Sequence, residues 1–354
     1  MSTATVKANR ILAVVAACLF LLSALSYRES VVRAERFERG QKFLPNLNPD
    51  EIATISITKG GVETELNRRG DEFIVSSGYG YPADNASVNR FIKDVLELGL
   101  EKEVGSGDDL REELELTADG ENTLEVAFAN EAGNEMVRFL VGKAFDDGSG
   151  NYVLRTDGDG EDGEENEIYL TSSQVYLDTD SDDFVRKEII DLAQSKVASI
   201  QGADFAYVRT DGSLALEGGV PSGMKESFKA NQVKGVLSGL RFTKHYLADA
   251  PEVQGLRFDS ELNVMLDDDS SFALAAAERD GKHFLRIVGN HQVTGQMQIS
   301  LDASEDEVRE TSEVLARADE IREFNELHGS WVYEVTETIA DKVRMRRADL
   351  LEDA

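Results

Sequence analysis

The side chains that most often perform chemistry in proteins are few and scattered in this sequence. The four histidines, His245, His283, His291 and His328, never stand three or four residues apart, so no pair has the spacing of a helical zinc site. Cys18 is the only cysteine, and it lies in an apolar run near the N-terminus. The rest of the chain therefore offers no disulfide, no thiol nucleophile and no cysteine-based zinc site. We expect the histidines to be structural or surface residues.

Three segments concentrate carboxylates, which are the ligands that Ca²⁺ prefers. DGDGEDGEENE occupies residues 157–167, DTDSDD residues 178–183 and DDDSS residues 267–271. Counted from its first aspartate, neither of the first two segments has the sixth-position glycine and twelfth-position glutamate of an EF-hand loop. The pattern therefore favours solvated loops, a helix cap and a hairpin turn. Weak calcium binding, as in a calcium-dependent adhesion module, is the alternative.

Two glycine-rich segments match the spacing of a dinucleotide-binding loop. They are GYGYPA at residues 78–83 and GDGEDG at residues 158–163. Such a loop must point backbone N–H groups at a phosphate, and Pro82 lacks that donor. The acids in the second segment would repel a phosphate group. We therefore expect plain turns at both places, with no cofactor and no catalytic site.

Near its end the chain carries its densest basic cluster, just after its only tryptophan. One interpretation is a helix that packs through Ile339 and Val343 and leaves its charges in solvent. The other is a docking surface for an acidic partner or for lipid headgroups. The candidate docking residues are Trp331, Tyr333, Lys342, Arg344, Arg346 and Arg347.

The overall charge excludes one class of partner. The chain of 354 residues has a formal net charge of −31. A surface this acidic repels phosphates, so we expect no nucleic-acid partner. It also suits a salty exterior, because dissolved ions screen the repulsion between like charges.

Residues 11–27, ILAVVAACLFLLSALSY, form an uncharged run of 17 residues. This is the short end of the length that spans a bilayer, so we predict a transmembrane anchor. A cleaved signal peptide ending near Ala24 and Ser26 is one alternative. A lipoprotein with Cys18 as its lipid-bearing residue is another, although the apolar run continues beyond that cysteine.

The orientation of the anchor rests on conflicting signals. Lys7 and Arg10 precede the run, as in most exported proteins. A larger basic group follows it, which by the positive-inside rule favours the opposite orientation. We expect a single-pass inner-membrane protein whose C-terminal part is periplasmic. The basic residues after the run are Arg28, Arg33, Arg36, Arg39 and Lys42.

Hydrophobic periodicity indicates strands and helices in both halves of the chain. Ile55 and Ile57 open an alternating hairpin, and residues 84–100 repeat apolar side chains at helical spacing. A long helix is predicted over residues 304–327, where Ser304 and Glu307 can form a capping box.

The same order of elements occurs twice. NEIYLTSSQVYLDTDSDDFVRKEIIDL and GSWVYEVTETIADKVRMRRADLL both read as a strand, a polar turn and a helix ending in V-R-x-x-x-x-D-L. We therefore predict an α+β fold made of a duplicated module, each copy with a mostly antiparallel sheet and a helix on one face. The expected parts are a cytoplasmic N-region at 1–10, the anchor at 11–27, a stalk at 28–42 and two repeats at 43–193 and 194–354.

Three segments resemble the family of domains of unknown function called DUF4340. They are FLPNLNPDEIATISIT, YPADNASVNRFIKDVLELG and GSWVYEVTETIADKVRMRRADLL, and the resemblance extends over residues 43–351. Members are membrane-anchored bacterial proteins, often encoded beside ABC-transporter subunits of the gliding-motility type. The resemblance implies a non-enzymatic extracytoplasmic accessory or binding subunit that contacts such a transporter. A carboxylate-dependent hydrolase of envelope polymers is the alternative, and it would need two acids meeting in one pocket.

Overall fold

The structure is a computed structural model that describes residues 40–354 apart from residue 119 and the segments 157–166 and 292–303. The chain divides into two compact units, unit 1 ending at Arg186 and unit 2 beginning at Lys187. Each unit has its own sheet and its own core.

The predicted anchor at residues 11–27 lies outside the described residues, as do the N-region and nearly all of the stalk. From residue 40 onward, leaving aside the gaps, no helix has the length and apolar character needed to cross a membrane.

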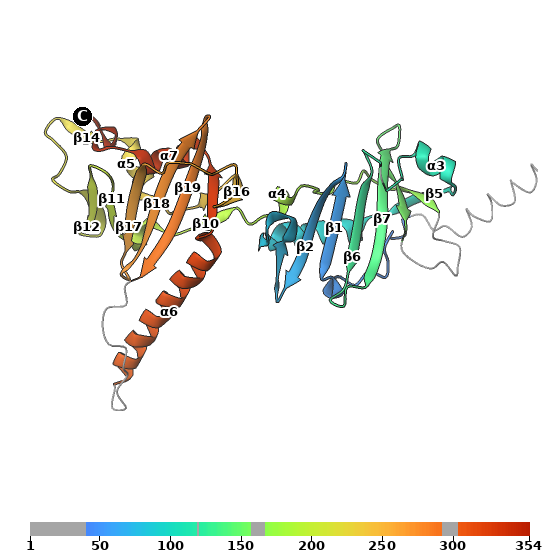
Figure 1. Cartoon of the computed structure of the whole chain (residues 1–354), viewed down its shortest axis with the longest axis horizontal. Helices are drawn as coiled ribbons and strands as arrows, with labels where there is room; N and C mark the ends of the chain where they lie inside the picture. Colours follow the sequence, from blue (N-terminus) through green and yellow to red (C-terminus); the bar gives the residue numbers. More distant parts are fainter. Residues whose placement is uncertain (1–39, 119, 157–166, 292–303) are drawn as a thin grey trace, which may run out of the picture. The chain divides into compact units, whose positions relative to one another are not determined.

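Unit 1 is built on one nine-stranded sheet. Its strands are β1 Thr54–Lys59, β2 Val62–Arg69, β3 Glu72–Val75, β4 Tyr81–Pro82, β5 Leu100–Gly105, β6 Leu124–Ala129, β7 Glu135–Ala144, β8 Asn151–Arg155 and β9 Ile168–Thr171. They lie in the order β4-β3-β2-β1-β6-β7-β8-β9-β5. Every neighbouring pair is antiparallel. Figure 1 shows β1, β2, β6 and β7 side by side.

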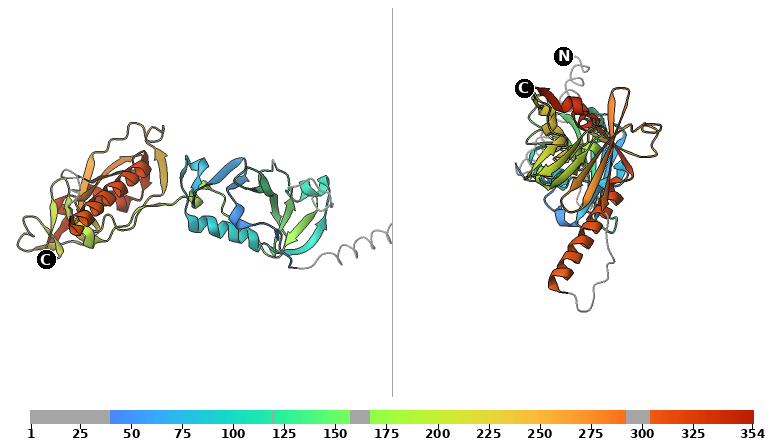
Figure 2. Two further views of the ribbon diagram at one scale, coloured as in Figure 1. Left: turned by 90° about the horizontal axis from the view of Figure 1, so that it is seen from below. Right: turned by 90° about the vertical axis from the view of Figure 1, so that its left-hand side faces the viewer.

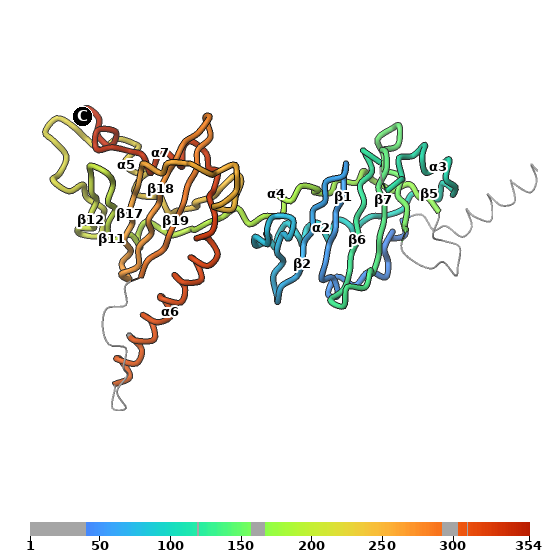
Figure 3. The backbone as a smooth tube through the Cα atoms, in the orientation of Figure 1, coloured from blue at the N-terminus to red at the C-terminus, as the bar shows by residue number. Residues whose placement is uncertain are grey.

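One face of this sheet is covered by helix α2, Asn85–Glu97. Asp84 caps the helix by accepting a hydrogen bond from the N–H of Ala86 at 3.0 Å. The buried side of α2 includes Val88 and Phe91, and the Phe91 ring lies 6.4 Å from that of Phe128 on β6. The helix and its apolar face agree with the sequence prediction, and Figure 3 traces it behind β1.

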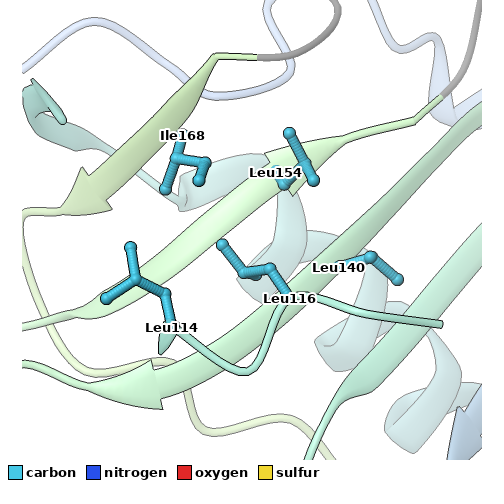
Figure 4. Close-up of a cluster of buried hydrophobic side chains, with 5 residues drawn as sticks. All are labelled: Leu114, Leu116, Leu140, Leu154 and Ile168. Carbon is cyan, nitrogen blue, oxygen red and sulfur yellow. The ribbon is translucent and has the colours of Figure 1, made fainter. Parts of the chain in front are cut away.

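The other face of the sheet holds a second, smaller core. Helix α3, Asp108–Glu113, leads into two leucines that pack against β7, β8 and β9. Alternation along a strand sends successive side chains to opposite faces, which is how one sheet supports two cores. Figure 4 shows the cluster, whose members are Leu114, Leu116, Leu140, Leu154 and Ile168.

Unit 2 is built on an eight-stranded sheet. Its strands are β11 Val197–Gln201, β12 Ala206–Thr210, β13 Ser213–Leu216, β16 Lys244–Leu247, β17 Ser260–Leu266, β18 Ser270–Arg279, β19 Lys282–His291 and β20 Trp331–Val335. The order is β13-β12-β11-β17-β18-β19-β20-β16, again antiparallel throughout. The predicted α+β class with mostly antiparallel sheets is thereby confirmed.

Two small two-stranded sheets complete unit 2. One pairs β10 with β15 and the other pairs β14 with β21. The bounds are β10 Glu188–Ile190, β15 Leu240–Arg241, β14 Met224–Glu226 and β21 Leu351–Asp353.

The described part of unit 2 contains three α-helices, and the longest is α6, Glu305–His328. Its capping box is the predicted one, with Ser304 and Glu307 bonded to each other's backbone N–H groups. Figure 2 shows α6 in orange-red, and among the described helices it is the longest. The other two are α5, Phe228–Lys234, and α7, Glu337–Arg344.

Two predicted helices are shorter in the structure. The helix expected over residues 181–193 is only α4, Ser181–Phe184. Val185 then bridges to Ala83, and β10 follows as an extended strand in unit 2. The helix expected up to residue 351 ends at Arg344. In the first place pairing with a strand distant in sequence, which periodicity cannot reveal, outweighs helical spacing. In the second the chain continues as a short 3-10 helix, η4 Arg347–Leu350, before β21.

Candidate functional site

The candidate docking residues from the sequence separate into core and surface positions. Trp331 and Tyr333 lie on β20 and are 7% and 0% exposed. The Tyr333 hydroxyl is 2.7 Å from Nδ1 of His328, and the Tyr333 ring stacks on Phe242 at 4.9 Å. Both aromatic side chains are therefore core residues, which a partner cannot reach without opening the sheet.

Arg347 has a structural role. Its backbone N–H donates to the Asp204 carboxylate at 2.8 Å. Its guanidinium donates to the carbonyl of Glu217 at 3.0 Å and to that of Gly219 at 2.9 Å. The side chain thus ties the end of the chain to the loop that follows β13.

Arg346 and Lys342 differ in exposure. Arg346 is exposed, and its backbone N–H donates to the Asp349 carboxylate at 2.9 Å. Lys342 is half-buried on α7, and this burial lowers the pKa of its ammonium group. Of the two, only Arg346 presents its charge fully to solvent.

Arg344, at the C-terminal end of α7, is the predicted docking residue that lines a pocket. Its guanidinium donates to Glu278 at 3.0 Å, and the same nitrogen lies 3.1 Å from Nδ1 of His283. Since arginine can only donate, Nδ1 of His283 would be the acceptor in this second contact. Glu278 on β18 and His283 on β19 face each other one pair before the turn of this hairpin, so the hairpin places both side chains against α7.

The pocket beside Arg344 has a volume of about 500 Å³. The loop before β17 supplies Arg257, which is exposed and forms no ion pair among the described residues. Arg279, at the end of β18, donates to the carbonyl of Gln254 at 2.9 Å and so holds that loop. The lining residues are Gly255, Leu256, Arg257, Asp259, Ser260, Glu278, Arg279 and Arg344.

The charges of this pocket are unusual for the chain. Three arginines face two acids in the lining, whereas the chain as a whole has a net charge of −31. Guanidinium groups bind carboxylates and phosphates through paired N–H donors. The arrangement can therefore hold an acidic group of a partner or ligand, and we call it the arginine pocket.

Sequence reasoning found Arg344 but missed Arg257 and Arg279. Arg257 lies in a loop without a motif, and Arg279 precedes the Asp280–Gly281 turn of a hairpin. Their positions 65 residues or more from Arg344 in the sequence gave no sign that the three would meet. Only the pairing of β17 with β18, and the placement of α7 against them, brings them together.

The acidic segments are placed as turns and caps where they are described. Asp178 pairs with Arg90 at 3.3 Å, and Asp180 caps α4 through the N–H of Asp182 at 2.9 Å. The DDDSS segment is the β17–β18 turn, in which Asp269 has a φ of 62°. Residues 157–166, which hold most of the longest acidic segment, lie outside the described residues.

The histidines do not meet one another as a metal site. His283 and His291 lie near opposite ends of β19, and His328 bonds to Tyr333. Among the described residues, no group of three or more His, Cys, Asp or Glu side chains is arranged to hold a metal ion.

The family model for a domain of unknown function, DUF4340, matches residues 75–257, which is more than half of the chain. The chain belongs to the DUF4340 family. The match begins at the end of β3 in unit 1 and ends inside the arginine pocket of unit 2, at Arg257. It is shorter than the resemblance over residues 43–351. Neither the curated proteins nor the solved structures contain a match to the chain.

Proposed function

We propose that this DUF4340 protein is a non-enzymatic accessory or binding subunit, anchored in the inner membrane by residues 11–27 and working in the periplasm beside an ABC-type transporter. The arginine pocket is the observation that best supports a binding role. A pocket with excess positive charge on a strongly acidic protein selects partners by charge, because the rest of the surface repels acidic groups. The transporter itself is what the family resemblance implies.

The hydrolase alternative has little support among the described residues. A catalytic acid needs a pKa raised by burial. Asp147, Asp268 and Glu307 each have a displaced pKa, and in each of them it is lowered. Hydrogen bonds from Ser149 lower the pKa of Asp147, and hydrogen bonds from Ser304 lower that of Glu307. For Asp268, burial acts to raise the pKa, and hydrogen bonds from Ser270 together with the charge of Arg317 outweigh it.

Co-purification tests the proposed role. The full-length chain, extracted from its native membrane in a mild detergent, should bring transporter membrane subunits with it. Replacing Arg257, Arg279 and Arg344 together by alanine should abolish this. Replacing the exposed Arg241 and Lys244 of the same unit should not. A wild-type chain that emerges alone, as a stable monomer at native expression, would contradict the proposal.

Cysteine labelling tests the orientation separately. The only native cysteine, Cys18, lies within the proposed anchor, so the remainder of the chain has no thiol. A Ser312→Cys variant would place a thiol on an exposed part of α6. A membrane-impermeant maleimide should label it in cells whose outer membrane has been permeabilised. Labelling only after the inner membrane is disrupted would place this unit in the cytoplasm.

We also propose that the two units are copies of one duplicated module. Each strand of the eight-stranded sheet of unit 2 has a counterpart at the same place in the sheet of unit 1, from β3-β2-β1-β6 against β13-β12-β11-β17 to the final edge strands β5 and β16. The two small sheets of unit 2 have no such counterpart. The residues that face one another across the first five strands are buried in both units. These rows are Val75-Leu66-Ile55-Phe128-Val137 and Leu216-Tyr207-Ile200-Val264-Phe272.

The helix caps support the same proposal. The N–H of Asp84, the cap of α2, donates to the carbonyl of Phe184 at 2.6 Å. The N–H of Ser227, the cap of α5, donates to the carbonyl of Leu350 at 2.9 Å. This equivalence matches Phe184 with Leu350, whereas the V-R-x-x-x-x-D-L pattern of the sequence matches Phe184 with Lys342, so we treat α7 as an addition to unit 2. Experimental structures of the two units whose strands connected in different orders would contradict the duplication.

A further inference from the structure

Unit 1 contains a second pocket, distinct from the arginine pocket. It lies between helix α2, the end of β2 and the short helix η1, Pro49–Glu51, and has a volume of about 620 Å³. This is within the range of pockets that enclose small ligands. Its lining residues are Pro49, Asp50, Arg68, Asp71, Phe73, Asn85, Asn89, Ile92, Lys93, Leu96 and Glu97.

Three of the charged side chains that line this pocket form no ion pair with described residues. Arg68 lies with its guanidinium carbon 4.9 Å from the centre of the Phe73 ring, and Nε of Arg68 is buried without a hydrogen-bond partner. Within the described residues Arg68 forms no ion pair, and neither do Asp50 and Asp71. Asp50 and Asp71 are exposed, whereas Arg68 is half-buried. The pocket therefore presents unpaired charges of both signs beside one weak, exposed ion pair, Lys93–Glu97.

The uncharged lining adds two further features. Phe73, Ile92 and Leu96 provide an apolar wall. Asn89 is exposed on α2 and forms no hydrogen bond with described residues, so both its amide donor and its amide acceptor are available.

We infer that this pocket binds a small zwitterion, an apolar amino acid or a short apolar peptide with both ends free. The carboxylate end is matched by Arg68 and by Lys93, whose ammonium lies 3.8 Å from Glu97 in a weak, exposed pair. The ammonium end is matched by Asp50 and Asp71. An inorganic phosphate or a polyanion fits less well, because the lining holds three acids and only two basic residues.

The experiment uses the full chain in mild detergent and isothermal titration calorimetry. The probes are leucine, leucyl-leucine and trileucine, each compared with its N-acetylated and its C-amidated form. At least one free-ended probe should bind with a dissociation constant below about 1 mM, and blocking either end should weaken binding at least tenfold, which is about 1.4 kcal/mol.

Substitutions then assign the ends. Arg68→Gln should weaken the free-ended probe about tenfold and leave the affinity for the C-amidated probe unchanged, because that probe has no carboxylate to lose. Asp71→Asn should also weaken the free-ended probe, and it should leave the affinity for the N-acetylated probe unchanged, because that probe has no ammonium group. Arg69→Gln, at the exposed neighbouring position that does not line the pocket, is the matched control and should change neither.

Two results would overturn the inference. One is equal binding of free-ended and blocked probes, which would make the pocket an apolar site only. The other is the absence of binding by every free-ended probe up to about 10 mM. Since Arg68 also packs on Phe73, Arg68→Lys provides a check on folding: it keeps the charge and should retain most of the affinity. A negative result in this binding experiment would not bear on the role proposed for the arginine pocket, which the co-purification experiment tests.

Discussion

At the scale of single residues, the C-terminal basic cluster has four members with four different environments. Arg347 holds a loop, Arg344 lines a pocket, Arg346 faces solvent and Lys342 is half-buried. Positively charged side chains of this cluster therefore stabilise or destabilise the fold according to their environment. A half-buried ammonium without an ion-pair partner destabilises the fold, whereas the guanidinium of Arg347, which donates to two carbonyls, stabilises it.

Lys342→Met should stabilise unit 2. Among the described residues Lys342 has no ion pair, and burial disfavours its charged form, so removal of the charge should raise the free energy of unfolding by about 0.5 kcal/mol at pH 7. Urea unfolding of the two proteins measures this difference.

The contribution of Lys342 to stability should depend on pH. The pKa of Lys342 is lowered in the folded state, so the folded protein releases this proton at a lower pH than the unfolded chain does. The unfavourable term is therefore fully present below the folded-state pKa. It disappears as pH rises from there towards the ordinary lysine value of about 10.4. The stability advantage of Lys342→Met should shrink over that interval, and a constant advantage up to pH 10 would show that the charge is not its source.

Gly142→Ala should destabilise unit 1. Gly142 lies on β7, and a Cβ atom there would come within 2.2 Å of the carbonyl oxygen of Leu114. The overlap is with backbone, which cannot rotate away, so we expect a loss of about 2–3 kcal/mol in thermal or urea unfolding. Gly235→Ala is the control, because its Cβ would meet nothing closer than 3.6 Å.

At the scale of elements, helix α6 packs on the sheet through Ile321 and Phe324, and the side chain of Asn325 adds hydrogen bonds to the backbone of β19. Asn325 donates to the carbonyl of Gly289 at 2.8 Å and accepts from the N–H of the same residue at 2.8 Å. β20 pairs with β19 only over residues 283–285, so this part of β19 would otherwise be an open edge. Glycine at 289 suits the close approach, since a Cβ there would lie 3.2 Å from Ile321.

Asn325→Ala should therefore loosen α6 from β19. Loss of two half-buried hydrogen bonds should lower the free energy of unfolding by about 1–3 kcal/mol. Hydrogen exchange should speed up in the last turns of α6 and at Gly289. Asn290→Ala, an exposed neighbour on β19, is the control. Unchanged exchange at Gly289 would mean that the helix is held by its apolar contacts alone.

The elements also show where sequence patterns suffice. The helix at Asn85–Glu97 and the capping box of α6 are local features, set by spacing and by a cap within four residues, and the sequence predicts both. The helix predicted over residues 181–193 fails because Ile189 and its neighbours pair with β15, about 50 residues further along the chain. β-branched residues such as isoleucine accept either structure, and the available strand partner decides.

At the scale of the whole molecule, the division after Arg186 assigns β10 to unit 2. The sequence places the division at residue 193 instead, which would leave β15 without its partner. Two backbone hydrogen bonds also join residues 187–193 to the rest of unit 2. The N–H of Phe242 donates to the carbonyl of Lys187 at 3.0 Å, and the N–H of Leu192 donates to the carbonyl of Leu237 at 2.9 Å.

A fragment of residues 187–354 should therefore fold by itself, with a cooperative urea transition, because it contains the complete sheet and helices α5, α6 and α7. The matched fragment 194–354 should be less stable by about 1–3 kcal/mol, since it loses β10 with its buried Ile189. Equal stability of the two fragments would favour the boundary at 193.

The net charge of −31 leads to a prediction about salt. Repulsion between like charges destabilises a compact state, and salt screens it over about 10 Å at 0.1 M. The melting temperature should rise by several degrees between low salt and about 0.5 M NaCl, with most of the gain at the lower concentrations. Sucrose at equal osmolarity is the control. A melting temperature that did not respond to NaCl would mean that local ion pairs already compensate the excess charge.

The sequence alone determined the features that depend on neighbours in the chain. These are the apolar face of α2, the caps, the turn at residues 267–271, the α+β class and membership of the DUF4340 family. Tertiary structure alone decided which side chains meet. Arg257, Arg279 and Arg344 share one pocket because helix α7 packs against the β17–β18 pair. Arg68 shares another pocket with Asp50 of η1 and with side chains of helix α2. Periodicity records the face on which a residue lies, but it contains no information about what lies opposite that face.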